Sequence, residues 1–172
     1  MNPRRRFFPL LFGLLLAVPF MVTAQEDPGK ENIGHIAVGV IYATNGDPTQ
    51  AGRPLTELSP KLEKQIRSEG QLVFKNYRWL GREVKPLFRS YENWAQPLKP
   101  SDEVLVRFEA RTLPSDGLTP LDLELWLSRK KILKTDVILK GDKPLLVLGP
   151  AWRGGHLIIS IALAPEVKPV SK

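Results

Sequence analysis

The sequence predicts a mostly β (α+β) fold, an antiparallel β-sandwich of about seven or eight strands with one short helix docked on the sheet. The first observation is the alternation in 121–127, where leucine fills every odd position and two acids and a tryptophan fill the even ones. A period of two places the leucines on one face of a strand. The second is that apolar segments of this kind, separated by turn residues, follow one another from Val104 to Leu163. The third is that only one segment has helical periodicity, which favours a sandwich over repeated strand–helix–strand units.

The first 24 residues are predicted to be a cleaved export signal. Three arginines at 4–6 precede an apolar stretch at 7–20, and Ala24 ends a short-side-chain sequence typical of a cleavage site before Gln25. The alternative is an uncleaved anchor, but the stretch is shorter than the roughly 20 residues that cross a bilayer, and it contains two prolines. We therefore expect an exported protein, periplasmic or extracellular, with no transmembrane anchor after cleavage.

The composition of the remaining chain restricts its chemistry. It has 22 basic and 18 acidic residues once the three leader arginines are removed, a mildly basic balance for one domain at 35–164. The absence of cysteine excludes thiolate metal sites and cysteine nucleophiles. The two histidines, His35 and His156, have no partner at metal-ligand spacing, so no metal and no cofactor is expected.

The first half of the domain is predicted as a strand followed by the helix. After a flexible lead-in segment at 25–34, the uncharged segment Ile36–Ala43 indicates a strand covered on both faces, with Gly39 allowing a neighbouring backbone to approach. Ser59 is expected to cap a helix, and Gly70 is expected to end it in a left-handed conformation. The narrow apolar stripe of this short helix should dock on the sheet, over the first strand.

Four short motifs resemble a loosely defined group of small exported bacterial proteins of unknown function. They are Ile41-Tyr42-Ala43-Thr44-Asn45, Leu58-Ser59-Pro60-Lys61-Leu62, Phe74-Lys75-Asn76-Tyr77 and Leu98-Lys99-Pro100-Ser101-Asp102. The resemblance covers most of the chain after the leader. It implies an exported β-rich fold and supplies no catalytic residue.

The second half is predicted as a series of antiparallel strands. Two lie near 77–88 and 91–98, where Pro86 and Pro97 indicate an edge or a bulge. Further strands follow at 104–110, 121–127, 133–139, 145–148 and 157–163, with a loop at 149–155 and a frayed tail at 165–172.

The hairpin around 128–131 gives the most specific structural prediction. Residues 121–127 should pair with 133–139, with the leucines in the core and Asp122, Glu124 and Lys134 exposed. On this basis Leu125→Asp should prevent folding, whereas Glu124→Gln should leave stability nearly unchanged.

Aromatic and basic residues interleave between Phe74 and Trp94, which raises the possibility of a binding strip. Aromatic faces stack on sugars or bases, and cations attract polyanions. The candidate residues, with a tryptophan from the 149–155 loop added, are Lys75, Tyr77, Trp79, Arg82, Tyr91, Trp94 and Trp152. The alternative interpretation is that the aromatic side chains pack in the core beside solvated cations.

No catalytic signature accompanies these residues. Asp122 and Glu124 point the same way from one strand, an arrangement that would suit the paired carboxylates of a glycosidase, but acids on the wet face of a strand are far more often only solvated. His156 lies near Ser160 without a nucleophile elbow or a partnered acid. We therefore expect an exported, non-enzymatic protein that acts in binding or as an envelope accessory. The alternatives are a binder of anionic polysaccharide or of a membrane surface through the strip, and a hydrolase; nucleic acid is not expected as a partner.

Overall fold

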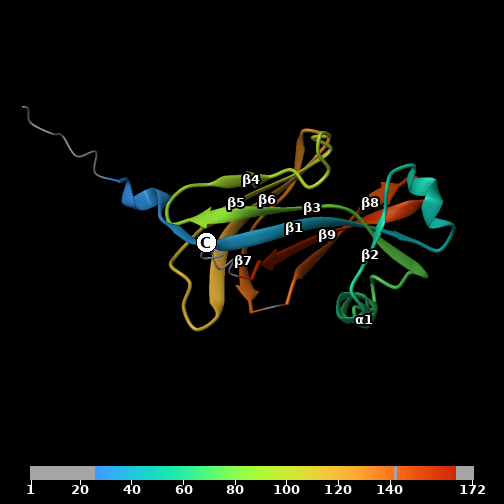
Figure 1. The fold of residues 1–172 in the computed structure, drawn as a ribbon, viewed down its shortest axis with the longest axis horizontal. Coiled ribbons are helices and arrows are strands. Elements are labelled where there is room, and N and C mark those ends of the chain that lie inside the picture. The colour runs from blue at the N-terminus through green and yellow to red at the C-terminus, as the bar shows by residue number, and fades with distance from the viewer. Residues whose placement is uncertain (1–25, 142, 166–172) are drawn as a thin grey trace, which may run out of the picture.

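The computed structural model of the chain describes residues 26–141 and 143–165, so the predicted export signal at 1–24 lies outside the described residues. The described strands form two antiparallel sheets that pack on each other, which confirms the predicted sandwich (Figure 1). The first sheet contains, in spatial order, β2 (Thr56–Glu57), β3 (Asn76–Phe88), β1 (Asn32–Thr44), β9 (Gly155–Leu163) and β8 (Leu145–Trp152). The second contains β4 (Asn93–Ala95), β5 (Val104–Ala110), β6 (Leu118–Leu127) and β7 (Lys130–Lys140). Two 3₁₀ turns, η1 (Pro28–Lys30) and η2 (Pro48–Ala51), flank β1.

The main hydrophobic core lies between the two sheets. Side chains from the first sheet, such as Val40 and Ile159, meet Val106, Phe108 and Leu123 from the second, and all five are fully buried. Each of these strands alternates between core and outer positions, as the sequence predicts. Burial of this apolar surface, at roughly 25 cal/mol per Å², is the main source of stability.

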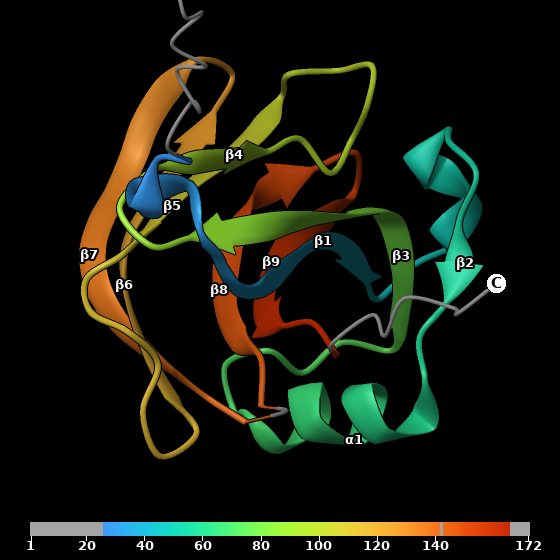
Figure 2. The same ribbon diagram turned by 60° about the vertical axis from the view of Figure 1, so that its left-hand side comes forward.

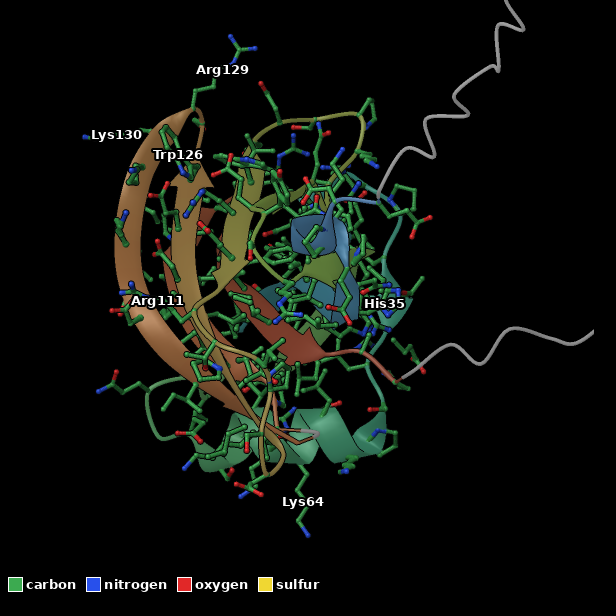
Figure 3. All side chains as sticks on the ribbon, turned by 90° about the vertical axis from the view of Figure 1, so that its left-hand side faces the viewer. His35, Lys64, Arg111, Trp126, Arg129 and Lys130 are labelled. Carbon is green, nitrogen blue, oxygen red and sulfur yellow. The ribbon has the colours of Figure 1, made fainter. Side chains whose placement is uncertain are left out.

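A second, smaller core lies on the outer face of the first sheet, under α1 (Pro60–Ser68). Ile66 of α1 is fully buried there against Ile41 and Ile158, while Val40 and Tyr42 of β1 face the main core. This confirms that β1 is covered on both faces and that the helix docks over it. Figure 3 shows Lys64, on the opposite side of α1, projecting into solvent.

The caps of α1 match the prediction at one end only. The Ser59 hydroxyl accepts a hydrogen bond of 3.3 Å from the Leu62 N–H, which confirms the N-cap. The predicted left-handed cap at Gly70 is wrong. The helix ends at Ser68, where the extended residue Glu69 is the C-cap and its N–H donates to the Ile66 carbonyl at 3.1 Å, and Gly70 is not in the left-handed conformation.

Pro86 and Gly81 both lie on β3 and show what surrounds this strand. Among the described strands, the part of β3 that contains Pro86 pairs only with β1, since β2 reaches only Arg78 and Trp79; the predicted edge is confirmed. The backbone approach predicted at Gly39 occurs instead at Gly81, where a Cβ atom would lie 2.1 Å from the Pro97 carbonyl oxygen.

The hairpin of β6 and β7 pairs antiparallel with its leucines toward the core, as predicted. Leu125 lies opposite Leu133, and Leu121 lies opposite Val137. The turn contains only Ser128 and Arg129, with φ of 47° and 66°, as a two-residue turn between twisted strands requires. Arg129 projects from its tip in Figure 3.

The predicted loop at 149–155 is largely strand. β8 continues to Trp152, with an irregularity between Leu148 and Ala151, and a turn at Arg153 and Gly154 leads directly into β9. The segment Gly149-Pro150 is tolerated because β8 is the edge of its sheet, where a missing N–H breaks no ladder bond.

The ends of the described chain lie beside each other. The lead-in segment predicted at 25–34 contains η1 and the first residues of β1, and Ala164 N–H donates to the His35 carbonyl at 2.8 Å. Most of the predicted tail, 166–172, lies outside the described residues. Among the described helices, none has the length and apolar character needed to cross a bilayer.

Candidate functional site

A cavity of about 200 Å³ lies between α1 and the outer face of the first sheet. It is the space that remains at one side of the helix, beyond the apolar contacts of the smaller core. The residues that line it come from β1, β3, β9, α1 and its N-cap, and the position just before β8: Ala37, Gly39, Ser59, Lys61, Leu62, Gln65, Trp79, Arg82, Pro144, Ser160 and Ala162. Because these elements belong to the folded frame rather than to long loops, the cavity is part of the scaffold.

Four small residues on two neighbouring strands form the floor of the cavity. Ala37 of β1 lies opposite Ala162 of β9, and Gly39 lies opposite Ser160. Side chains this short cannot reach the helix above them, so space remains between the two layers. A larger residue at any of these positions would fill that space.

Trp79 of β3 forms one wall, and its position depends on Gly39. A Cβ atom on Gly39 would lie 2.3 Å from Cζ3 of the indole ring. Only glycine therefore lets the ring lie this close to β1. The ring is buried, and its own packing fixes it at the side of the cavity.

Arg82, at the rim, is the most distinctive polar group of the site. Its guanidinium carbon lies 4.8 Å from the centre of the Trp79 ring, a cation–π contact. Within the part of the chain that the structure describes, no ion pair or hydrogen bond joins this guanidinium to another residue. An exposed arginine held over an indole keeps its donors available for a ligand.

The polar lining of the cavity favours negative charge. Its described residues include two cations, Lys61 and Arg82, and no carboxylate. Ser160, which is buried, adds a hydroxyl group to the floor, and Gln65 adds an amide from the helix. The arrangement offers an apolar, flat-walled space with hydrogen-bond donors on its margin.

Two of the seven predicted site residues, Trp79 and Arg82, meet at this cavity. Tyr77 is also under α1 but fully buried, and its hydroxyl donates to the Leu72 carbonyl at 2.6 Å. Lys75 is exposed just before β3, and its backbone N–H donates to Asn45 Oδ1 at 3.0 Å.

The other three predicted residues lie elsewhere. Tyr91 donates to Asp27 Oδ2 at 2.6 Å, beside η1, which holds the pKa of the Tyr91 hydroxyl above its usual value. Trp94 lies on the outer face of the second sheet, 6.0 Å from the ring of Trp126. Trp152 packs on the main core, at 5.8 Å from Tyr42, and donates to Glu103 at 2.8 Å.

The residues of the predicted strip therefore point to different parts of the molecule. Trp79 and Arg82 are on the outer face of the first sheet, Trp94 is on the outer face of the second, and Trp152 faces the interior. No single surface carries all seven, so a long polymer could not contact them together.

The outer face of the second sheet carries an ion-pair network, and here the predicted exposure of Glu124 and Asp122 is wrong. Glu124 is only 6% exposed, because Lys131, Lys134 and Trp126 cover it. The hydrogen bond from Lys131 Nζ, at 3.0 Å, lowers the pKa of Glu124 to about 2, although desolvation opposes the shift. Asp122 is bridged by Arg107 at 3.3 Å and by Lys134 at 3.7 Å, while Lys134 is exposed as predicted.

Both carboxylates are thus paired with cations from neighbouring strands. A general acid needs a pKa raised toward neutrality, and that of Glu124 is shifted the opposite way. We assign this pair a structural role in joining β5, β6 and β7. Figure 3 shows Trp126 and Arg111 on the same layer, at different heights.

The described residues provide no group of three or more histidine or acidic side chains that could hold a metal ion. His156 lies against Phe74, with ring centres 5.4 Å apart, and its buried Nδ1 has no hydrogen-bond partner. No residue near it in the described chain forms the base or nucleophile of a triad with it. The histidine therefore packs at the edge of the smaller core, against Phe74.

One signal in the sequence could have located the cavity. Ala37 and Gly39 alternate on one strand and Ser160 and Ala162 alternate on another, so two strands present small residues on the same face. Only their direct pairing in the sheet makes this a floor, and that pairing joins residues more than 120 positions apart.

Comparison with known proteins returns no match to any family model, curated protein or solved structure.

Proposed function

We propose that this protein is an exported, non-enzymatic binding protein that holds a small organic anion in the cavity under α1. The observation that carries the proposal is Arg82, a cation without an ion-pair partner among the described residues, held over Trp79 at the rim of an apolar cavity. A guanidinium stacked face-on over a ring leaves the N–H donors at its edge available to water or to an anion. The predicted export signal supports a role in the periplasm or outside the cell.

The size and lining of the cavity limit the ligand. A volume of about 200 Å³ is below the roughly 300 to 1,000 Å³ of pockets for drug-sized molecules. The alanines of the floor and the indole wall favour a short or flat apolar body. A carboxylate on that body would accept charge-assisted hydrogen bonds from Arg82.

The same lining supports binding rather than turnover. Ser160 is the one described floor residue with a hydroxyl, and a serine nucleophile needs a base within hydrogen-bond reach. The described lining has neither histidine nor carboxylate to serve as that base. Asp122 and Glu124 belong to the other sheet and are ion-paired.

Paired ligands that differ only in charge test this proposal. Benzoate and butyrate are titrated against the chain without its leader, beside their neutral amides, benzamide and butyramide, with the tryptophan indole N–H signals followed by NMR. The acids should bind, shift the Trp79 signal and lose affinity as salt rises, whereas the amides should bind at least about tenfold more weakly.

Two variants separate the cavity from general surface charge. Arg82→Gln should weaken binding of the acids by about tenfold to a hundredfold, which corresponds to the loss of a hydrogen bond between charged groups. Arg89→Gln, which removes an exposed arginine paired with Glu31 beyond the end of β3, should leave binding unchanged. Equal binding of acid and amide, or an equal loss in both variants, would reject the proposal.

A further inference from the structure

The strand β7 is the free edge of the second sheet. It is 11 residues long and, among the described strands, pairs only with β6; Figure 2 shows it at the outer margin of the molecule, in orange at the left. A free edge presents unpaired backbone N–H and C=O groups that can form a ladder with another strand. The edge also carries two large exposed apolar side chains, Ile132 at 47% and Ile138 at 56%.

The sequence of β7 is symmetric in character about Thr135. Ile132 and Ile138 lie three residues to either side, Leu133 and Val137 lie two residues away, and Lys134 and Asp136 are the immediate neighbours. We propose that β7 pairs antiparallel with β7 of a second copy of this chain, about a two-fold axis at Thr135. The two four-stranded sheets then join into one continuous sheet of the dimer.

Charge complementarity specifies this register. In an antiparallel pair about Thr135, Lys134 of each copy lies opposite Asp136 of the other, which gives two attractive cross-strand pairs. An axis at Lys134 or at Asp136 would instead place a residue opposite its own copy, with like charges in contact. An axis at Val137 would place Lys134 opposite Lys140, and one at Leu133 would place Lys134 opposite Ile132.

In this register, apolar side chains also meet across the two copies, on both the core face and the outer face of the second sheet. Leu133 and Val137 are partly buried against the main core, and in the pair each lies opposite the other, so the two cores become continuous. Ile132 lies opposite Ile138 and covers it. The exposed isoleucines thus acquire a partner that the described residues of a single chain do not provide.

The ionic groups are free to move into this arrangement. Lys134 bridges Glu124 at 3.3 Å but is 59% exposed, and Asp136 bridges Arg111 at 2.5 Å but is 64% exposed. Each remains next to its present partner while it turns toward the free edge. The network of the second sheet then extends across both copies.

The ends of β7 limit the association to a dimer of modest affinity. Lys130 would lie opposite Lys140, and the register shift between Leu125 and Trp126 bends β7 near Ile132, so pairing is confined to 132–138. The opposite edge, β4, is three residues long and offers little for further addition. A closed two-fold contact therefore forms dimers rather than fibres.

Charge-swapped variants test the register directly. Lys134→Glu places a glutamate opposite Asp136 of the other copy, and Asp136→Lys places a lysine opposite Lys134, so each variant alone should be monomeric in analytical ultracentrifugation. A mixture of the two should form a heterodimer, because every cross-strand pair is then attractive. The parent chain should dimerise as its concentration rises, at least about tenfold more tightly than either single variant. A parent that stays monomeric up to millimolar concentration, or folded single variants that do not associate when mixed, would overturn the proposal.

A cysteine variant keeps the test valid if the charge swaps disturb folding. The chain has no cysteine, so Thr135→Cys introduces a single thiol. The two-fold axis then places this thiol opposite the same thiol of the second copy. Directly opposed residues have Cβ atoms about 4.5 to 5.5 Å apart, close enough for a disulfide after a small adjustment. Under mild oxidation this variant should form a covalent dimer at least about tenfold faster than Ser90→Cys, an exposed control beyond β3. Equal rates for the two variants would overturn the proposal.

Discussion

The Cα atom of Gly39 lies directly beside the indole ring of Trp79, and a Cβ atom there would come within 2.3 Å of Cζ3. The glycine on β1 and the tryptophan on β3 therefore determine each other's position, and together they form the floor and one wall of the candidate cavity. The contact is between a backbone and a side chain. It explains why an apolar, charge-free strand contains a glycine at its centre.

Gly39→Ala should force the ring of Trp79 out of its place. Overpacking of this kind lowers the free energy of unfolding by about 1 to 3 kcal/mol. Thermal and urea unfolding measure the loss, and the tryptophan emission of the folded state should shift because the ring environment changes. The matched control is Gly70→Ala, since a Cβ atom at Gly70 meets no atom within 4 Å. If both variants unfold like the parent, the close contact of Gly39 with Trp79 is wrong.

Leu125→Asp should prevent folding, because Leu125 is fully buried between the two sheets. An unpaired carboxylate there costs several kcal/mol, a large part of the stability of a domain this size. Far-ultraviolet circular dichroism should show loss of the strand signal. Val84→Asp, on an exposed position of β3, should fold normally. A folded Leu125→Asp variant would refute the assignment of this face of β6 to the core.

The sequence was sufficient to predict the sandwich, since a period of two shows which residues of a strand share a face. It correctly predicted the antiparallel pairing of β6 with β7, the side of β6 that faces the core, and the docking of α1 over β1. It could not show to which sheet each strand belongs. Trp79 and Trp94 were therefore grouped, although they lie on the outer faces of different sheets. The burial of Glu124 was missed for a similar reason. Its covering cations lie on the next strand, and only the folded register brings Lys131 and Lys134 over it.

Glu83 fastens the first sheet to the connection that follows β4. Its carboxylate accepts hydrogen bonds from the Gln96 N–H and from Lys99 Nζ, both at 2.5 Å, and its side chain is only 12% exposed. Burial raises the pKa of Glu83, but these bonds outweigh it and hold the pKa below its ordinary value. Glu83→Gln should therefore lower the free energy of unfolding at neutral pH by about 1 to 3 kcal/mol, as measured in urea.

The control for Glu83 is an acid whose ion pair is exposed. Glu57 lies 3.8 Å from Arg78 and is 85% exposed, so Glu57→Gln should change stability by less than about 0.5 kcal/mol. Equal effects of the two substitutions would show that Glu83 does not join the sheets.

Glu124→Gln should destabilise the protein at neutral pH, contrary to the expectation from its place on a polar strand face. The carboxylate is covered by Lys131, Lys134 and Trp126, and the hydrogen bond from Lys131 lowers its pKa from 4.5 to about 2. A lowered pKa in the folded state means that the ionised form contributes stability, fully above the unfolded value near 4.5 and progressively less as the pH falls toward 2. The difference in urea unfolding free energy between the parent and Glu124→Gln should therefore be largest at pH 7, shrink between pH 4.5 and 2, and be nearly absent below pH 2. Glu69→Gln, which changes an exposed acid outside any ion pair of the described residues, should show no such dependence. A constant difference between parent and Glu124→Gln across this pH range would mean that the charge of Glu124 does not stabilise the fold, and that the amide is simply a poorer fit beneath Lys131 and Trp126.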